Sequence, residues 1–231
     1  MLSRMSRPAK YLEIGLDDGW TFVAVESEES IGVDPNPRFD LSLLSPHQRV
    51  FATTSDDFFA SHNEEWKFDL VFVDGLHTAE QTLRDIRNAF KVLNSGGVIV
   101  IDDVIPSDEV SAIPNHVESL RIRAASGLPG SAWHGDVFRV LGAIQHCEPW
   151  LNWVTVDDRA RDDRRNPQTV LWRDDGKPFS PNLLDEQFLL PSDYSEVFES
   201  GVPDVFHARP ETDAMGAVMA FLEQHAASQP E

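Results

Sequence analysis

The sequence predicts an α/β fold in which helices cover both faces of a seven-stranded, mainly parallel sheet. Between Tyr11 and about Arg173, short apolar runs alternate with longer amphipathic segments, a pattern typical of strand and helix units around a parallel sheet. Several apolar runs have no polar face, as expected of strands that helices cover on both sides. The segments that we expect to be strands are 11–15, 30–34, 50–54, 70–74, 97–102, 152–156 and 168–172.

The clearest helix is predicted directly after strand 70–74. Thr78 and Gln81 form a capping-box pattern, and apolar residues then recur at intervals of three and four up to an expected end at 94–97. A second helical stripe occupies residues 134–146. The last two expected strands follow it with only a charged turn between them, so we expect them to pair antiparallel.

The composition changes after about Asp174. We expect residues 1–174 to form one domain, because a chain of 231 residues is short enough for a single core. Residues 175–231 are acidic and spaced by prolines, and they end in an amphipathic stretch near Ala214–His225. We expect this extension to pack on the domain or to serve in a homodimer.

The charge balance argues against nucleic acids and membrane surfaces as partners. Lysine and arginine total 19 against 39 acidic residues, which gives a formal net charge of −20 and a field that repels phosphate groups. The first ten residues lack the apolar segment of a secretory signal, and no apolar run approaches the roughly 20 residues of a membrane span. With Cys147 as the single cysteine, an intramolecular disulfide is impossible, so we expect a cytoplasmic protein.

A glycine-containing loop follows the first expected strand. Gly15 permits close backbone approach to a ligand, and Gly19 lies where the chain must turn, although glycines after a strand often serve only the turn. The spacing differs from the dinucleotide pattern G-x-G-x-x-G. Asp34 ends the second strand about 20 residues later, where an acidic side chain can accept hydrogen bonds from ribose hydroxyls. Its alternative role is that of a turn residue before Pro35.

Further polar residues follow the third, fourth and fifth strands. Ser55 either caps the next helix or, with Asp56, faces an adenine ring. Asp74 and His77 follow the fourth strand, and Asp102 and Asp103 follow the fifth, so their side chains are expected at one edge of the sheet. Carboxylates gathered in this way need a proton, a divalent cation or a positively charged ligand.

Taken in order, these motifs resemble those of class I S-adenosylmethionine-dependent methyltransferases, particularly a bacterial branch that reads LEIG, GVDP, TSD-x-FF and DGLH. The resemblance covers about residues 10–105, with an echo in 133–137, and the chain departs from the branch in having Asp102 and Asp103 where a His-Asp pair is common. It implies a Rossmann-like fold that binds S-adenosylmethionine where the strand order switches. The implied contacts are Glu13, Gly15 and Gly19 near the methionine part, Asp34 at the ribose, Ser55 and Asp56 near adenine, and Asp74 at the amino group or the reaction site.

Methyl transfer to oxygen needs alignment of the nucleophile with the methyl carbon and removal of a proton. His77 is the first candidate base, because catechol-type O-methyltransferases place a basic residue three positions after the carboxylate. His134 is the second, since it follows a long loop, 105–133, that could act as a lid; both histidines have alternative structural roles.

Asp74, Asp102 and Asp103 resemble the set that holds magnesium in the catechol-type enzymes. A hydroxylated small molecule or sugar is the expected methyl acceptor. The alternatives are an NAD(P)-dependent oxidoreductase, which uses the same sheet but a third glycine that is missing here, and a non-catalytic Rossmann-like binding protein.

Overall fold

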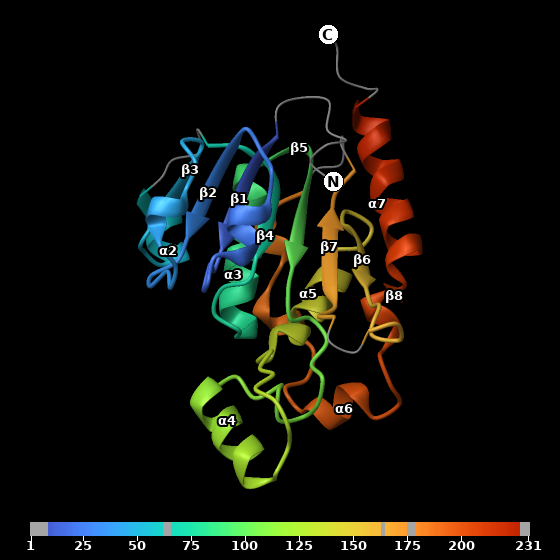
Figure 1. The fold of residues 1–231 in the computed structure, drawn as a ribbon. Coiled ribbons are helices and arrows are strands. Elements are labelled where there is room, and N and C mark those ends of the chain that lie inside the picture. The colour runs from blue at the N-terminus through green and yellow to red at the C-terminus, as the bar shows by residue number, and fades with distance from the viewer. Residues whose placement is uncertain (1–8, 62–65, 163–164, 175–178, 227–231) are drawn as a thin grey trace.

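The computed structural model describes residues 9–61, 66–162, 165–174 and 179–226, and in these residues it contains one eight-stranded sheet (Figure 1). The strand order is β3-β2-β1-β4-β5-β7-β6-β8. β7 pairs antiparallel with both β5 and β6, whereas the other pairs are parallel, which confirms the mainly parallel sheet with one antiparallel strand. The strands are β1 (Lys10–Ile14), β2 (Glu29–Val33), β3 (Gln48–Phe51), β4 (Phe68–Val73), β5 (Leu93–Ile101), β6 (Asn152–Val156), β7 (Gln168–Trp172) and β8 (Ala208–Arg209).

The eighth strand was not expected from the sequence. β8 has two residues, and they pair with Thr155 and Val156 at the outer edge of the sheet. So short a strand carries no periodic signal, because alternation needs at least four residues to be visible.

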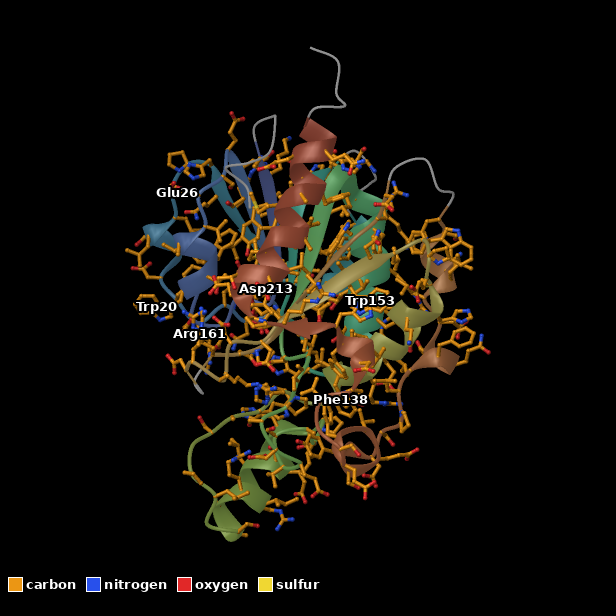
Figure 2. All side chains as sticks on the ribbon, turned by 90° about the vertical axis from the view of Figure 1, so that its right-hand side faces the viewer. Trp20, Glu26, Phe138, Trp153, Arg161 and Asp213 are labelled. Carbon is orange, nitrogen blue, oxygen red and sulfur yellow. The ribbon has the colours of Figure 1, made fainter. Side chains whose placement is uncertain are left out.

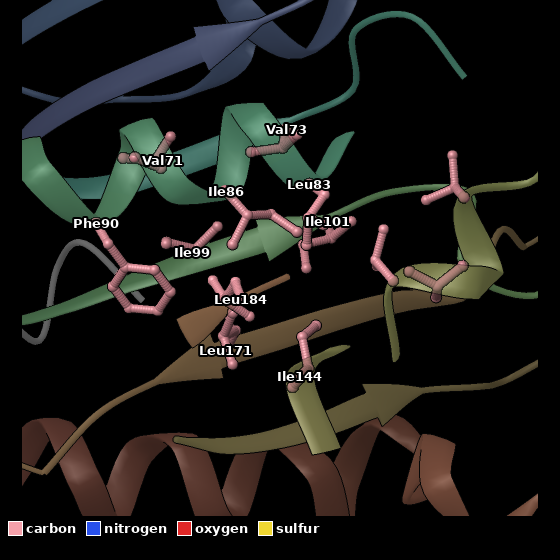
Figure 3. Close-up of a cluster of buried hydrophobic side chains, with 14 of the residues drawn as sticks. Val71, Val73, Leu83, Ile86, Phe90, Ile99, Ile101, Ile144, Leu171 and Leu184 are labelled. Atoms are coloured by element: carbon pink, nitrogen blue, oxygen red, sulfur yellow. The ribbon is translucent and has the colours of Figure 1, made fainter. Parts of the chain in front are cut away.

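Helices lie on both faces of the sheet, as predicted. One face packs on α1 and α7, whose buried side chains include Phe22, Val218 and Leu222. The opposite face packs on α2, α3 and α5; Figure 3 shows Ile86 and Ile144 of these helices against Ile99 and Leu171 of the strands. The helices are α1 (Trp20–Ala24), α2 (Ser55–Ser61), α3 (Ala79–Val92), α4 (His116–Ala125), α5 (Val140–His146), α6 (Tyr194–Phe198) and α7 (Glu211–Ala226).

Helix α3 begins as predicted but ends earlier. The Thr78 side chain accepts a hydrogen bond from the Gln81 backbone N–H (3.4 Å), which is the expected N-cap. The helix ends at Val92, and β5 starts at Leu93, which pairs with Phe68 of β4. The Asn-Ser-Gly-Gly segment expected to end the helix therefore lies inside the strand. Within the strand these residues form an irregularity, because the register shifts between Phe68 and Leu70 and Gly96 has φ +73°, so the glycines still mark a turn of the backbone.

The segment after residue 178 contributes to both faces. Leu184 and Phe206 are fully buried in the cluster with α3 and α5, while α7 lies along the other face. The division of the chain at residue 174 stays a prediction, and residues 1–8, 175–178 and 227–231 lie outside the described residues. No helix in the described part of the chain is both long and apolar enough to span a membrane.

The order of the strands determines where polar side chains gather. From β1 the chain goes to β2 and β3 on one side, then crosses to β4 and β5 on the other. Ligands of open α/β sheets bind beyond the carboxyl ends of the strands at such a switch. The residues after β1, β2, β4 and β5 lie at this edge, which we call the rim, and α4 with its flanking loops projects beyond it (Figure 1).

Candidate functional site

Two glycines shape the loop between β1 and α1. Gly15 has φ +86°, and a Cβ atom there would lie 1.9 Å from the carbonyl oxygen of Asp74. Gly19 has φ +76°, and its Cβ would lie 2.6 Å from the ring of Phe39. Both positions thus need glycine, for backbone conformation as well as for space. At Gly15 the close neighbour is the backbone after β4, so this glycine brings the two central loops of the rim together.

Asp34 holds the same loop from the end of β2. Its Oδ2 accepts hydrogen bonds from the backbone N–H groups of Leu16 (2.8 Å) and Asp17 (3.2 Å), and its Oδ1 accepts one from Asn36 (2.7 Å). The turn role considered for Asp34 is therefore present in the structure, and it extends to the glycine loop. A carboxylate oxygen can accept more than one hydrogen bond, so these contacts leave capacity for a ribose hydroxyl.

Glu13 is an almost fully buried carboxyl in β1, with 2% exposure. Burial, reinforced by the charge of Asp74, raises its pKa to about 8, although a hydrogen bond from the Tyr11 hydroxyl (2.6 Å) acts in the opposite direction. A positive group bound nearby would favour ionisation of this carboxyl, which is the property expected of a site for the amino group of S-adenosylmethionine.

Ser55 and Asp56 lie at the start of α2 and face α3. The Gln81 side-chain amide lies 3.2 Å from Ser55 Oγ and 3.3 Å from Asp56 Oδ1. The helix is capped by Thr54, whose Oγ1 accepts from the Asp57 N–H (3.1 Å), so the capping role considered for Ser55 is wrong. Thr54 takes this role because its side chain is three positions before the N–H that it accepts from, as a capping box requires.

Asp85 is a buried polar residue near this region that sequence reasoning missed. It is 1% exposed, its Oδ2 is buried without a hydrogen-bond partner among the described residues, and burial raises its pKa to about 6. The sequence did contain a signal for this buried residue. Asp85 lies on the side of α3 that faces the core, one position before Ile86.

The centre of the rim is an ion-pair cluster of Asp74, His77 and Asp103. His77 Nδ1 lies 2.8 Å from Asp103 Oδ2, and its Nε2 lies 3.5 Å from Asp74 Oδ1. Burial alone would lower the pKa of His77, but the hydrogen bonds and charges of the two carboxylates raise it to about 10. Burial acts to raise the pKa of Asp103, yet the contacts with His77 leave that pKa below its usual value. Asp103 also has φ +61°, a conformation that residues other than glycine rarely adopt.

Asp102 lies beside the cluster but has other partners. Its Oδ1 accepts from the Asp103 N–H (2.9 Å) and from the side-chain amide of Asn166 (2.8 Å). Burial and the charges of Asp74 and Asp103 raise its pKa well above the usual range. Among the described residues, the group placed to share a metal ion is Asp74, His77 and Asp103, so Asp102 of the predicted magnesium set is replaced by a histidine. Asn166 was missed because it belongs to the turn before β7, far away in sequence.

Residues 133–136 are attached to the rim one after another. The Trp133 ring stacks on His77, with ring centroids 4.3 Å apart. Gly135 has φ +61°, and a Cβ there would lie 1.8 Å from the His77 carbonyl oxygen. The Asp136 side chain accepts from the N–H of Ala79 at the start of α3 (2.8 Å). The loop that was expected to cover the site is thus fixed at its C-terminal end against the segment that carries His77.

His134 lies in this segment and is brought to the same carboxylate as His77. Its Nε2 lies 3.9 Å from Asp103 Oδ1, while its Nδ1 is buried and has no hydrogen-bond partner among the described residues. Burial lowers the pKa of His134, so the imidazole is neutral at pH 7. The two candidate bases therefore differ in charge although they share Asp103.

The rim as a whole is suited to a cationic ligand. Glu13, Asp74 and Asp102 all have raised pKa values, mainly because they are buried, which means that their ionised forms are under-stabilised. A ligand with a sulfonium and an ammonium group offsets such carboxylates, and Gly15 provides the close backbone approach beside them.

Comparisons with known proteins agree with this geometry. Residues 12–104 match the family model described as a methyltransferase domain. No curated protein matches the sequence. Among solved structures, a proposed O-methyltransferase from Klebsiella pneumoniae is 16% identical, with 73% of this chain and 74% of that chain covered and a TM-score of 0.50. An O-methyltransferase from Bacillus cereus in complex with S-adenosylhomocysteine is also 16% identical, with 75% and 77% covered and a TM-score of 0.48.

At these identities the solved structures bear on the fold alone, and the family match extends over the half of the sheet that forms the rim. The strand order, with β7 reversed, is that of the fold predicted from the motifs. Residues 12–104 therefore match a methyltransferase domain, and the fold around them is the one that the motifs predicted.

Proposed function

We propose that the chain is an S-adenosylmethionine-dependent methyltransferase that methylates a hydroxyl oxygen of a small molecule or sugar, with His134 as the general base. The observation that carries the proposal is a neutral, buried imidazole beside Asp103 whose Nδ1 has no hydrogen-bond partner in the described part of the chain. A net charge of −20 supports a small acceptor in preference to a nucleic acid.

S-adenosylmethionine supplies a methyl group activated by attachment to a sulfonium. The residues proposed to hold it are those at the carboxyl ends of β1, β2 and β4. Glu13 and Asp74 provide negative charge for its positive groups, and Asp34 orders the glycine loop while it accepts from the ribose. Ser55 and Asp56 remain the proposed neighbours of the adenine, and Gln81 positions both of them.

His77, the first candidate from the sequence, is poorly suited to accept a proton. With a pKa of about 10, it already carries one at neutral pH. Its imidazolium instead lies between Asp74 and Asp103 and offsets their repulsion. We assign it a positioning role at the centre of the rim.

His134 is suited to be the base for the opposite reason. It is neutral at pH 7, and when its Nε2 carries the hydrogen, Nδ1 has a free lone pair. The Asp103 carboxylate, 3.9 Å from Nε2, would stabilise the imidazolium that forms when a hydroxyl proton moves to Nδ1. Because Nδ1 is buried, an acceptor hydroxyl reaches it only after the packing around His134 opens.

The predicted magnesium set of Asp74, Asp102 and Asp103 fits a hard cation poorly. Mg²⁺ requires several oxygen ligands in octahedral geometry, but Asp103 is already bound by His77 and Asn166, and Asp102 by Asn166. The His77 imidazolium provides the positive charge that a metal would otherwise supply. We therefore propose methyl transfer that does not require a metal, and no step here depends on one.

The proposal is tested by measuring S-adenosylhomocysteine release with a panel of polyphenols, hydroxy acids and monosaccharides. His134→Gln should lower kcat by about 10² to 10⁴, the usual contribution of a general base, and should leave the Kd for S-adenosylhomocysteine unchanged. His116→Gln is the matched control, because His116 also stacks on the Trp133 ring, with ring centroids 4.4 Å apart, but is exposed. An unchanged kcat in His134→Gln, or an equal loss in both variants, would refute the assignment.

A further inference from the structure

A cavity of about 290 Å³ lies beside β6, apart from the rim. Asn152 begins β6 and pairs with Trp172 at the end of the antiparallel β7. Because β6 runs parallel to β5, Asn152 lies at the end of the sheet opposite the carboxyl ends of β4 and β5. None of the residues that line the cavity belongs to the rim. Figure 2 labels Trp153, the residue after Asn152, on this outer part of the sheet.

Four of the lining residues share one face of the sheet, the face that packs on α7. Paired residues of neighbouring strands point their side chains to the same side, as do residues two apart in one strand. Asn152 therefore shares a face with its partner Trp172 and with Val154. Arg209 pairs with Val156, two residues beyond Val154, and so points to the same side. Ala217 of α7 covers this side of the cavity.

The Asn152 side chain has an unmet hydrogen-bonding need. Its Nδ2 is buried and has no partner among the residues that the structure describes. A buried amide without a partner is costly, and native structures contain few of them. Because Asn152 lines the cavity, an acceptor oxygen of a bound molecule is a suitable partner.

Arg209 is a second group without a partner. In the described ranges, no carboxylate lies within 4.0 Å of its guanidinium, although arginines such as Arg49, Arg123 and Arg159 all form ion pairs. Arg209 is exposed, and it lines the cavity, so its positive charge is available to a bound anion. Its backbone is fixed by the pairing of β8 with β6 and by the hydrogen bond from the Asp157 N–H to its carbonyl (2.9 Å). These contacts anchor the backbone of Arg209 beside the cavity, and its guanidinium can bind a carboxylate there through two parallel hydrogen bonds.

The wall between these two polar groups is apolar. Val154, Ala217 and Trp172 line it, and the Trp172 ring contacts Phe221 of α7, with ring centroids 5.7 Å apart. At the Asn152 end, the exposed carboxylate of Glu148 also lines the cavity. A hydroxyl group bound there can accept from the Asn152 amide and donate to Glu148 at once.

We propose that this cavity is a second small-molecule site, which binds an aromatic hydroxycarboxylate with its carboxylate at Arg209 and its hydroxyl at Asn152. The flat apolar body of such a ligand lies against Trp172 and Val154. The volume is just below the range of about 300 to 1,000 Å³ that is usual for small-molecule sites, which limits the ligand to one or two rings. The site is distinct from the rim, so its occupancy does not exclude the methyl donor.

The test is calorimetric titration of the full chain with three probes of one shape: 6-hydroxy-2-naphthoate, 2-naphthoate and 2-naphthol. We expect 6-hydroxy-2-naphthoate to bind at one site, about tenfold or more tightly than either of the other two probes. This affinity should be the same with and without saturating S-adenosylhomocysteine. Arg209→Gln should weaken both carboxylates about tenfold and leave 2-naphthol unchanged. Asn152→Leu, which is similar in size, should weaken only the two probes that carry a hydroxyl.

Arg121→Gln is the matched control, since Arg121 is an exposed arginine of α4 and should leave all three affinities unchanged. Three results would each overturn the proposal: no binding of 6-hydroxy-2-naphthoate at millimolar concentration, equal affinities for the three probes, or competition by S-adenosylhomocysteine. If the melting temperatures of Arg209→Gln and Asn152→Leu are close to that of the native protein, any loss of affinity comes from the site and not from unfolding.

Discussion

Replacing Glu13 by glutamine should change the number of protons released when the cofactor binds. At pH 7 the solution is one unit below the Glu13 pKa of about 8, so about nine-tenths of these carboxyls are protonated. An ammonium group bound beside Glu13 favours the ionised form, and the proton must then leave. Complete ionisation on binding releases about 0.9 proton from Glu13 at this pH.

The assay is isothermal titration with S-adenosylhomocysteine at pH 7 in phosphate and in Tris, whose ionisation enthalpies differ greatly. The dependence of the binding enthalpy on the buffer gives the number of protons released. Asp74 and Asp102 also have raised pKa values and can contribute protons, so the informative quantity is the difference between native protein and Glu13→Gln. We expect this difference to be about 0.9 proton at pH 7, from the same one-unit gap to the pKa.

The same substitution has a stability effect that serves as a control for folding. A carboxyl whose folded-state pKa is raised stabilises the protein most below its unfolded-state pKa, and that contribution is lost as the pH rises toward the folded-state value. For Glu13 the window runs from 4.5 to about 8, and the cost at its upper end is of the order of 5 kcal/mol at most. Without cofactor, Glu13→Gln should therefore be more stable than the native protein at pH 8.5. Equal proton release by a folded variant and the native protein would refute the placement of Glu13 beside the cofactor.

Three further predictions follow from the rim. Gly135→Ala should lower both the melting temperature and kcat, because its Cβ would meet the His77 carbonyl. Gly127 is the control: it has a similar φ of +67° but faces open space, so Gly127→Ala should lower only the melting temperature, and by less. Equal effects of the two substitutions in thermal scans and turnover assays would contradict the close packing at Gly135. Methyl transfer should be unchanged by EDTA and by added Mg²⁺, and a loss of turnover restored by Mg²⁺ would show that a metal is needed. The ion pairs of His77 should stabilise the fold fully below about pH 6.5 and be lost as the pH rises through about 10, so urea unfolding between pH 7 and 11 should show a decline that His77→Asn reduces.

Local sequence was a good guide wherever a pattern repeats over several residues. The seven longer strands were predicted close to their observed positions, because uniformly apolar runs and the glycines and aspartates that follow them are local signals. Thr78 was predicted as a cap from its spacing to Gln81. The exact end of α3 and the existence of β8 were not, since both depend on pairing with a strand far away in the chain.

For the candidate site, the sequence by itself predicted that Asp34, Asp74 and Asp103 lie at the rim, because each of them follows a strand of the parallel part of the sheet. It could not decide the roles of those residues. Only the tertiary structure places Asp103 between two histidines, one stabilised as a cation by two carboxylates and the other kept neutral by burial. It also brings Asn166 and Trp133 to the same place. The physical reason is that the charge of an ionisable side chain depends on burial and on neighbours that arrive from distant parts of the chain.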